Sequence, residues 1–530
     1  MKKSITYLLL SIIWVTPLWA QIDTARVDAL FSRFAGRSPG CALNIVADGR
    51  SIYENGYGYA SLELDVPITP KTVFDIGSVS KQFTAMSILL LMREGKLSLD
   101  DDIRCYVPEL PDLGHVTIRQ LMHHTSGWRD YTDLMAFVGW DERDHTTDQD
   151  AIDALRPQRA LNFRPGTNWR YSNTGFFLMS LVVQRVSGKS LREFAAERIF
   201  GPLGMSDTRY LDDTRQIVPR RATAYAPADS GGGWQVEMSN WDQVGDGAVQ
   251  TTVDDLAKWD ANFYSPTVGD ARLVEMLQTP DQGHYGFGLW RDTYHRETLV
   301  WHSGAWAGYR AVIMRFPDRR RSIIALCNLA NAHTYVLATR LADILIPDTV
   351  PAPVVTHRPK ASPGLYSSDA VGDILRVTAR GADTVVIEVG DQHHTLVPFG
   401  GEILRDTTDG ITYEFGDQHV IVRSFGDVPD AMRLVPPPTR SPGLAGRYVS
   451  RELGITWTVS TKDSKLALHR PRGDDVALAP LYADAFMTSD GTPVRFLRDA
   501  SGQVTALSVT TNGVHDLRFS RERHVSVRAP

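Results

Sequence analysis

The sequence predicts a mixed α/β (α+β) domain followed by two small all-β domains. Helix-period stretches and short strand-like runs are interspersed up to about residue 346, whereas alternating strand patterns dominate beyond it. Two proline-rich stretches, at 347–363 and 436–442, separate the three parts. The chain has 530 residues, of which 43% are hydrophobic, so it is long enough for a large core with additional domains.

The charge balance argues against a nucleic-acid partner. The chain carries 56 Lys and Arg residues against 62 Asp and Glu, a net charge of -6, without a long run of one sign. Its three cysteines are Cys41, Cys105 and Cys327. This number excludes a disulfide scaffold and a four-thiolate metal site.

The first twenty residues have the layout of a secretory signal peptide. Lys2 and Lys3 precede an apolar run over 5–15, and Ala20 lies at the expected cleavage site. The run is shorter than the roughly 20 residues that span a bilayer. We therefore expect residues 1–20 to be removed and the protein to be periplasmic or secreted. An uncleaved anchor is the alternative, because Leu18 is large for the position three residues before the cleavage site.

Residues 21–348 form the predicted mixed domain. Helical periodicity is found at 81–94, 173–187 and 253–263. Strands are predicted at 42–46, 311–316 and 322–326.

The C-terminal region contains two copies of one β-domain. The segment Ser362-Pro-Gly-Leu365 recurs 79 residues later as Ser441-Pro-Gly-Leu444, and Asp409-Gly410 and Asp490-Gly491 supply hairpin turns. Each copy has room for roughly eight short strands, and closure into a barrel would remove their exposed edges. The predicted barrel-like domains span 362–436 and 443–526.

The strongest local signal for chemistry is Ser78-Val-Ser-Lys81 at the start of the first predicted helix. A serine and a lysine three residues apart at a helix start lie on the same side, one turn apart. A desolvated lysine can lose its proton near neutral pH, so the pair provides a nucleophile with its own base. The alternative is a helix-capping Ser78 with an exposed Lys81, because this short pattern also arises by chance.

Two further motifs follow in order along the chain. Tyr171-Ser-Asn173 opens the second predicted helix, and Trp301-His-Ser-Gly304 precedes a predicted strand. Together with Ser78 and Lys81, this set resembles the serine penicillin-recognising hydrolases, which include class C β-lactamases, D-alanyl-D-alanine carboxypeptidases, D-aminopeptidases and esterases. The resemblance covers about residues 25 to 346. It implies a β-lactamase/transpeptidase-like domain with a central antiparallel sheet flanked by helices.

The resemblance also implies the catalytic roles. Ser78 would attack a carbonyl carbon to give an acyl-enzyme, and Lys81 with Tyr171 would move the proton to the leaving group. The backbone N–H groups of Ser78 and Ala305 would form the oxyanion hole. Water would then release the acyl group.

Three residues would contact the substrate by the same resemblance: Asn173, His302 and Gly304. His302 departs from the β-lactamase pattern, in which a lysine usually meets the carboxylate of the substrate. Because histidine is mostly neutral at pH 7, this departure disfavours β-lactam hydrolysis as the main task and is more compatible with a peptidase or an esterase.

His123 and His124 are adjacent, which could suggest a metal site. No carboxylate or cysteine stands at ligand spacing from them, and the resemblance makes both loop-structuring residues. We expect no metal and no other cofactor.

A catalytic domain followed by two small barrels resembles the multi-domain D-aminopeptidases. We therefore expect an exported serine hydrolase that cleaves D-amino-acid-containing peptides or amides. A carboxylesterase and a class C-like β-lactamase are the alternatives, with esters, β-lactams or cell-wall fragments as substrates. An alternative of another class is a sensor that binds penicillin or cell-wall peptides and turns over slowly. The oligomeric state is left open.

The resemblance to D-aminopeptidases further implies that a loop from a C-terminal barrel reaches the active site. The β-domains are then expected to regulate access to Ser78. The competing interpretation makes them modules for cell-wall binding or oligomerisation.

By resemblance, Cys41 and Cys327 lie on neighbouring strands of the central sheet. Both a disulfide and a pair of buried thiols are compatible with this placement. We favour the thiols, because cross-strand geometry often strains a disulfide and the sequence does not fix the register.

Overall fold

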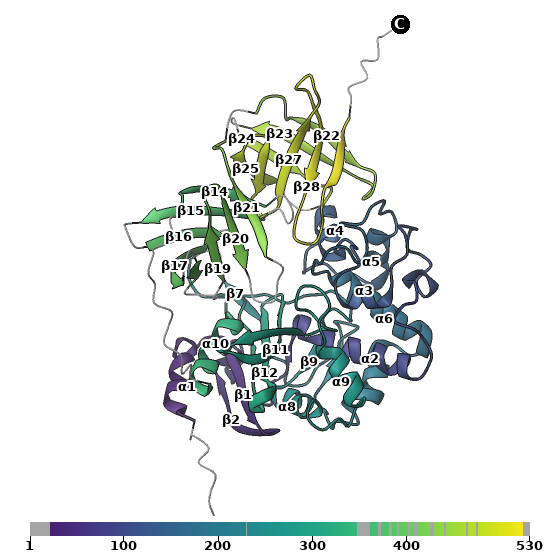
Figure 1. Cartoon of the computed structure of the whole chain (residues 1–530), viewed down its shortest axis with the longest axis vertical. Helices are drawn as coiled ribbons and strands as arrows, with labels where there is room; N and C mark the ends of the chain where they lie inside the picture. The colour runs from purple at the N-terminus through teal and green to yellow at the C-terminus, as the bar shows by residue number, and fades with distance from the viewer. Residues whose placement is uncertain are drawn as a thin grey trace, which may run out of the picture.

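The structure is a computed structural model, and it shows an N-terminal mixed domain with two β-barrels at one end of the long axis (Figure 1). It describes residues 22–228, 231–346, 361–368, 373–380, 384–389, 392–400, 403–406, 411–423, 429–438, 441–462, 465–472 and 475–522. The predicted signal peptide, most of the first proline-rich stretch and the Asp409-Gly410 turn lie outside these residues.

A six-stranded antiparallel sheet forms the centre of the N-terminal domain, in the order β10-β11-β12-β13-β1-β2. The inner strands β1, β12 and β13 are buried at almost every position, which requires cover on both faces of the sheet. The predicted strands at 42–46, 311–316 and 322–326 form parts of these three. The strands are β1 Cys41–Ala47, β2 Arg50–Tyr57, β10 Trp290–Tyr294, β11 Glu297–Trp306, β12 Tyr309–Phe316 and β13 Arg321–Cys327.

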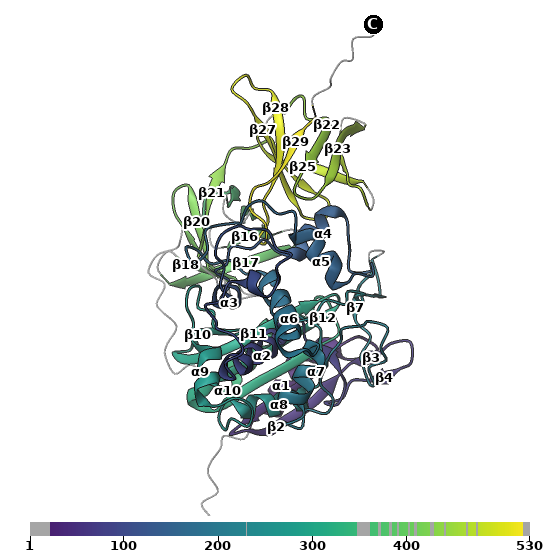
Figure 2. The same ribbon diagram turned by 90° about the vertical axis from the view of Figure 1, so that its right-hand side faces the viewer.

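Three helices confirm the predicted periodicity, namely α2 Lys81–Arg93, α6 Asn173–Ser187 and α8 Val253–Asn262. Helix α2 is buried along most of its length and contacts α6 (Figure 2). Gly188 ends α6 with a φ of 73°, a conformation that glycine adopts without strain. The other helices are α1 Thr24–Leu30, α3 Ile118–Met122, α4 Tyr131–Val138, α5 Asp148–Leu155, α7 Leu191–Ala195, α9 Ala271–Gln278 and α10 Thr334–Leu345.

Short strands connect the helices to the sheet. Strands β5 Phe74–Asp75, β9 Val249–Thr251 and β6 Arg209–Tyr210 form one small sheet. Two hairpin-like pairs are β3 Tyr59–Ser61 with β4 Val66–Pro67, and β7 Tyr225–Pro227 with β8 Trp234–Val236.

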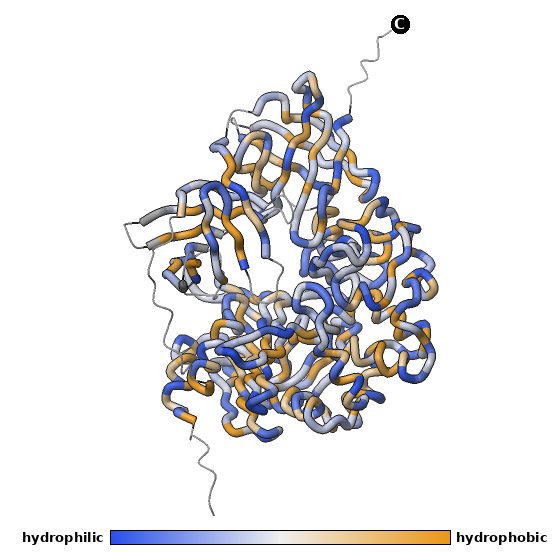
Figure 3. Tube along the Cα trace, viewed as in Figure 1, coloured by the Kyte–Doolittle hydropathy of each residue, from blue (hydrophilic) through white to orange (hydrophobic). Residues whose placement is uncertain are grey.

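The C-terminal region forms two closed barrels of eight antiparallel strands, as predicted from the repeat. Each barrel has a tyrosine as the third residue of its first strand. The Tyr366 hydroxyl donates to the Ser362 carbonyl oxygen at 3.0 Å, and the Tyr448 hydroxyl donates to the Leu444 carbonyl oxygen at 2.6 Å. Hydrophobic and hydrophilic segments alternate along the barrel strands (Figure 3), as expected for a sheet with one buried face.

The strands of each barrel follow one another in sequence order. The first contains β14 Gly364–Ser367, β15 Ile374–Arg380, β16 Thr384–Val389, β17 Gln392–Gly400, β18 Ile403–Asp406, β19 Thr412–Phe415, β20 His419–Arg423 and β21 Asp430–Val435. The second contains β22 Gly446–Ser450, β23 Ile455–Lys462, β24 Lys465–His469, β25 Val476–Tyr482, β26 Ala485–Thr488, β27 Pro493–Arg498, β28 Val504–Val509 and β29 Leu517–Arg521.

The second barrel packs directly on the N-terminal domain, and the two share one continuous hydrophobic core. The Trp457 indole N–H donates to the Phe137 carbonyl oxygen at 3.1 Å, and the two rings meet edge to face. The first barrel has a separate hydrophobic cluster around Tyr366 and Tyr413.

Cys41 of β1 and Cys327 of β13 are register partners and form a disulfide. The preference for two buried thiols was therefore wrong. The antiparallel register places the two Cα atoms 4.0 Å apart, which is the information that the sequence lacked. Cys105 is a free, exposed thiol.

Among the described residues, no helix has both the length and the apolar character needed to cross a membrane.

Candidate active site

Ser78 lies in the 3₁₀ turn Gly77–Ser80, which leads directly into α2. The Gly77 N–H donates to the Asp75 carboxylate at 2.7 Å, which fixes the start of this turn. The Ser78 hydroxyl is partly exposed, whereas its neighbours Val79 and Ser80 are buried. The fold thus presents one hydroxyl at the end of a buried helix.

Lys81 is fully buried at the first position of α2, and its ammonium contacts the serine. Its Nζ donates to Ser78 Oγ at 2.9 Å, to Asn173 Oδ1 at 2.9 Å and to the Asp246 carbonyl oxygen at 2.7 Å. Burial lowers the pKa of Lys81 to about 8, while the carboxylates of Asp246 and Asp130 act in the opposite direction. This lysine can therefore lose its proton close to neutral pH and accept one from the serine.

Asn173 is the first residue of α6, and its backbone is hydrogen-bonded to the Asp130 carboxylate. The Asn173 N–H donates to Asp130 Oδ2 at 2.5 Å, and Asp130 also accepts from the N–H and hydroxyl of Thr132. The same carboxylate therefore caps α4 and fixes the position of Asn173.

Tyr171 is half-buried beside the lysine. Lys81 Nζ lies 4.9 Å from the centre of the Tyr171 ring, and the ring also packs against His124, with 4.3 Å between the ring centres. The structure thus brings together Ser78, Lys81, Tyr171 and Asn173.

Gly304 of β11 allows this strand to approach the serine turn. A Cβ atom on Gly304 would lie 1.9 Å from the Ile76 carbonyl oxygen and 3.1 Å from the Ser78 nitrogen. A Cβ atom on Gly77, which has a φ of 49°, would lie 2.8 Å from the Ala305 nitrogen. Only glycine fits at these two positions, and the close approach places the Ser78 and Ala305 backbones beside each other.

A cavity of about 260 Å³ opens on this side of the serine, and Ser78 and Ala305 are part of its wall. Several side chains of this wall, among them those of Trp241, Trp306 and Glu142, were not predicted from the sequence. Trp241 and Trp306 lie 5.5 Å apart between ring centres, and Glu142 is half-buried beside them. Burial raises the pKa of Glu142. These residues come from loops and a strand end, where no spacing pattern marks them.

In the described part of the chain, His302 lines neither the cavity beside Ser78 nor a larger cavity on the other side of Asn173. It is 2% exposed, its Nε2 accepts from the Tyr285 hydroxyl at 2.9 Å, and its Nδ1–H donates to the Ser303 carbonyl oxygen at 2.5 Å. Burial lowers its pKa to about 3. The neutral ring packs against Tyr171, and the expected contact of His302 with the substrate stays a prediction.

His123 and His124 structure the loop after α3. His123 Nδ1–H donates to the Tyr285 carbonyl oxygen at 3.0 Å, and His124 Nδ1 accepts from the Ser172 N–H at 3.2 Å. Among the described residues, no group of three or more His, Cys, Asp or Glu side chains is arranged to hold a metal ion.

A loop of the second barrel reaches the edge of the site. It joins β28 to β29, and its Gly513 carbonyl oxygen accepts from the Asp130 N–H at 2.9 Å. The Thr511 hydroxyl donates to the Asp133 carboxylate at 2.5 Å. The barrel thus contacts Asp130, the residue that holds Asn173.

Comparison with known proteins agrees with this geometry. The family described as Beta-lactamase matches residues 27–346. The chain is 32% identical to Penicillin-binding protein 4* of Bacillus subtilis, covering 54% of this chain and 67% of the relative. It is 27% identical to a D-aminopeptidase of Brucella canis, covering 92% of this chain and 96% of the relative.

The fold also matches the octameric penicillin-binding protein homologue from Pyrococcus abyssi, with a TM-score of 0.56, 23% identity, and coverage of 78% of this chain and all of that one. The chain belongs to the β-lactamase family. It is a serine hydrolase of that family, with two β-barrels after the catalytic domain.

Proposed function

We propose that this protein hydrolyses D-amino acid amides and short peptides with a free amino terminus, through an acyl-enzyme on Ser78. The observation that carries this proposal is the hydrogen bond from the buried Lys81 ammonium to Ser78 Oγ, beside a cavity that contains the Ala305 backbone. The match to D-aminopeptidase along nearly the whole chain, barrels included, supports the substrate class.

In this mechanism neutral Lys81 accepts the Ser78 proton as Oγ attacks the carbonyl carbon. The negative charge on the carbonyl oxygen is stabilised by the Ser78 and Ala305 N–H groups, each worth roughly 3 to 4 kcal/mol in comparable acyl transfers. Lys81 and Tyr171 return the proton to the leaving amine. Water, activated by the same groups, then hydrolyses the ester on Ser78.

The Ser78→Ala variant tests the nucleophile. We expect hydrolysis of a D-alanine anilide to be abolished while the thermal unfolding midpoint stays within a few degrees, because only one partly exposed oxygen is removed. Covalent labelling by a fluorophosphonate should disappear as well. More than about a tenth of the wild-type activity would contradict the assignment. Persistent labelling of the wild type without product release would instead favour the slow-turnover sensor.

Glu142 is proposed to bind the free amino group of the substrate. Its half-buried carboxylate shares the cavity with Ser78, and the faces of Trp241 and Trp306 would also favour a cation. We expect Glu142→Gln to reduce kcat/KM for D-alanine anilide by about tenfold, because a charged hydrogen bond is lost.

The matched measurement uses N-acetyl-D-alanine anilide, which has no ammonium group. Its hydrolysis should not decrease in Glu142→Gln. The Asp141→Asn variant is the control, since this neighbouring carboxylate pairs with Arg143 and lies outside the cavity. Equal losses on both anilides would remove Glu142 from amine recognition.

We further propose that the protein is exported by its N-terminal segment. The Cys41–Cys327 disulfide supports this proposal, because such bonds form and persist in oxidising compartments. Cell fractionation with N-terminal sequencing of the mature protein is the test, and a cytoplasmic protein that begins at Met1 would contradict it.

A further inference from the structure

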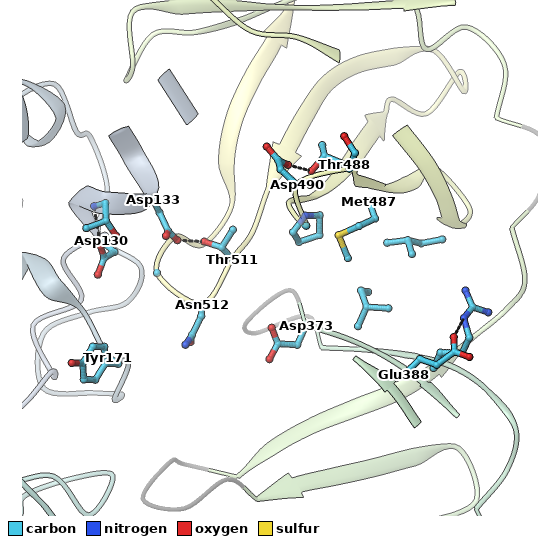
Figure 4. A pocket seen from close by; sticks show the side chains of 18 of the residues that line it. Asp130, Asp133, Tyr171, Asp373, Glu388, Met487, Thr488, Asp490, Thr511 and Asn512 are labelled. Atoms are coloured by element: carbon cyan, nitrogen blue, oxygen red, sulfur yellow. Dashed lines mark hydrogen bonds and ion pairs between the residues drawn. The ribbon is translucent and has the colours of Figure 1, made fainter. Parts of the chain in front are cut away.

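A second and larger cavity of about 840 Å³ lies between the catalytic domain and the two barrels (Figure 4). Tyr171 and Asn173 form part of its wall, so it opens directly onto the catalytic residues. Its volume lies in the range of small-molecule sites. Asn173 also borders the smaller cavity that contains Ser78, so the two spaces meet at this residue.

The two cavities divide the substrate at the bond that is cleaved. The smaller cavity contains the serine and Ala305, which must face the acyl carbonyl. The larger one begins on the other side of Asn173, beside the ring of Tyr171, whose hydroxyl oxygen is itself buried. The leaving group is therefore directed into the larger cavity.

The charge of this cavity is strongly one-sided. Five carboxylate side chains and one cationic side chain line it. The cation is Arg376, and the carboxylates are those of Asp130, Asp133, Asp373, Glu388 and Asp490. Arg376 pairs with Glu388 at 3.3 Å, and Asp490 pairs with Arg470 at 2.5 Å.

The three carboxylates at the catalytic end have no such partner. In the described part of the chain, no Lys, Arg or His side chain lies within ion-pair distance of Asp130, Asp133 or Asp373. Arg170 acts on Asp373 only at longer range, and its guanidinium donates to the Thr511 carbonyl oxygen at 3.2 Å. Figure 4 shows Asn512 of the barrel loop between Tyr171 and Asp373.

Part of the remaining wall is apolar and suits an aliphatic chain. This part is formed by Leu365, Ile374, Leu481 and Met487 of the two barrels, whereas Thr132, Thr488, Ser489, Thr511 and Asn512 add polar groups. An aliphatic stem with a terminal ammonium or guanidinium matches such a wall with carboxylates beside it. A leaving group with a carboxylate would instead meet like charges.

We propose that this cavity is the subsite for the leaving amine and that it selects leaving groups carrying a positive charge on an aliphatic chain, such as a basic amino acid side chain or a diamine. The inference rests on the proposed function for the direction of the substrate. It adds a preference on the leaving-group side that the catalytic residues themselves do not specify.

The test compares three D-alanyl amides of equal length, whose leaving amines are 1,5-diaminopentane, 1-aminohexane and 6-aminohexanoate. We expect kcat/KM to decrease in this order, with at least tenfold between the cationic and the anionic leaving group, and the difference to shrink at 0.5 M salt. Equal values for the three amides would overturn the proposal, as would a preference that salt does not alter.

Asp373→Lys is the variant that isolates the cavity charge. It should reduce the ratio of cationic to neutral kcat/KM by about tenfold, the effect of reversing one unit charge at short range in a hydrated site. Asp417→Lys is the matched control, because this exposed residue in the β19–β20 turn of the same barrel does not line the cavity. An equal change in both variants would show a general field effect and contradict the subsite.

A binding measurement separates this proposal from the catalytic one. The fluorescence change of dansylcadaverine, a diamine with one free ammonium, is titrated against that of its acetylated neutral form. Tighter binding of the cation to the wild type, lost in Asp373→Lys, supports the subsite even if no D-alanyl amide is hydrolysed. If the amides are hydrolysed but the two dyes bind alike, the subsite is wrong and the proposed function stands.

Discussion

Lys81 sets the pH dependence expected for the reaction. Its pKa is lowered to about 8 by burial, and the Asp246 carboxylate acts against this decrease. Because neutral Lys81 is the proposed base, kcat/KM for N-acetyl-D-alanine anilide, which has no titrating amine, should rise with pH and level off above an apparent pKa near 8. At lower pH the protonated ammonium cannot accept the serine proton.

The Asp246→Asn variant tests this interpretation. Removal of the carboxylate charge should lower the pKa of Lys81 further, so that the acidic limb of the pH–rate profile moves down by about one pH unit. The Tyr131→Phe variant is the control, since it removes the hydroxyl that donates to Asp246 at 3.2 Å without a change of charge. An acidic limb that stays in place in Asp246→Asn would mean that another group is the base.

At the scale of secondary structure, β1 and β13 are joined by the Cys41–Cys327 bond across a sequence separation of 286 residues. We expect the unreduced protein to show a single alkylatable thiol, on Cys105, in mass spectrometry after denaturation. Reduction should lower stability by about 2 to 4 kcal/mol, because the bond restricts the unfolded chain. Cys105→Ser should leave that difference unchanged, and three alkylated thiols without reductant would refute the bond.

The elements that carry the chemistry were the easiest to predict. Helices α2 and α6 begin at the matched motifs, and both are long segments rich in apolar residues that are buried over most of their length. Closure of the barrels was also predicted, because paired strands remove exposed edges. These features depend on local spacing, which is visible in one sequence.

Side chains from loops could not be predicted in the same way. Glu142, Trp241 and Asp130 lie between regular elements, and their positions depend on contacts such as that from the Trp241 indole N–H to the Asp141 carbonyl oxygen. The hydrogen bond between His302 and Tyr285 could not be predicted either, because Tyr285 lies on a separate loop. Such contacts join segments that are far apart in the sequence, and no repeating pattern of residues indicates that the two segments meet.

At the scale of the whole molecule, the loop between β28 and β29 joins the second barrel to the active site. A Cβ atom on Gly513 would lie 2.5 Å from the Asp130 Cβ and 2.7 Å from Asp133 Oδ2. We expect Gly513→Ala to displace the loop from Asp130 and to lower kcat by about tenfold, or about 1.4 kcal/mol of activation free energy, because Asp130 holds Asn173.

The same variant tests the expectation that the barrels regulate access to Ser78. A displaced loop should also raise the relative kcat/KM for bulky leaving groups. Gly232→Ala is the matched control, because a Cβ atom there meets open space. If Gly513→Ala alters neither kcat nor selectivity, the loop does not control the site and the barrels are better explained as binding or assembly modules.

The contact between Thr511 and Asp133 has a consequence for biosynthesis, because 378 residues separate its two ends. During synthesis, the segment that surrounds Ser78 emerges long before β28 and β29. Asp130 and Asp133 can form their contacts with Gly513 and Thr511 only after nearly the whole chain has been synthesised. A newly made molecule would therefore gain full hydrolytic activity only when its translation is almost complete.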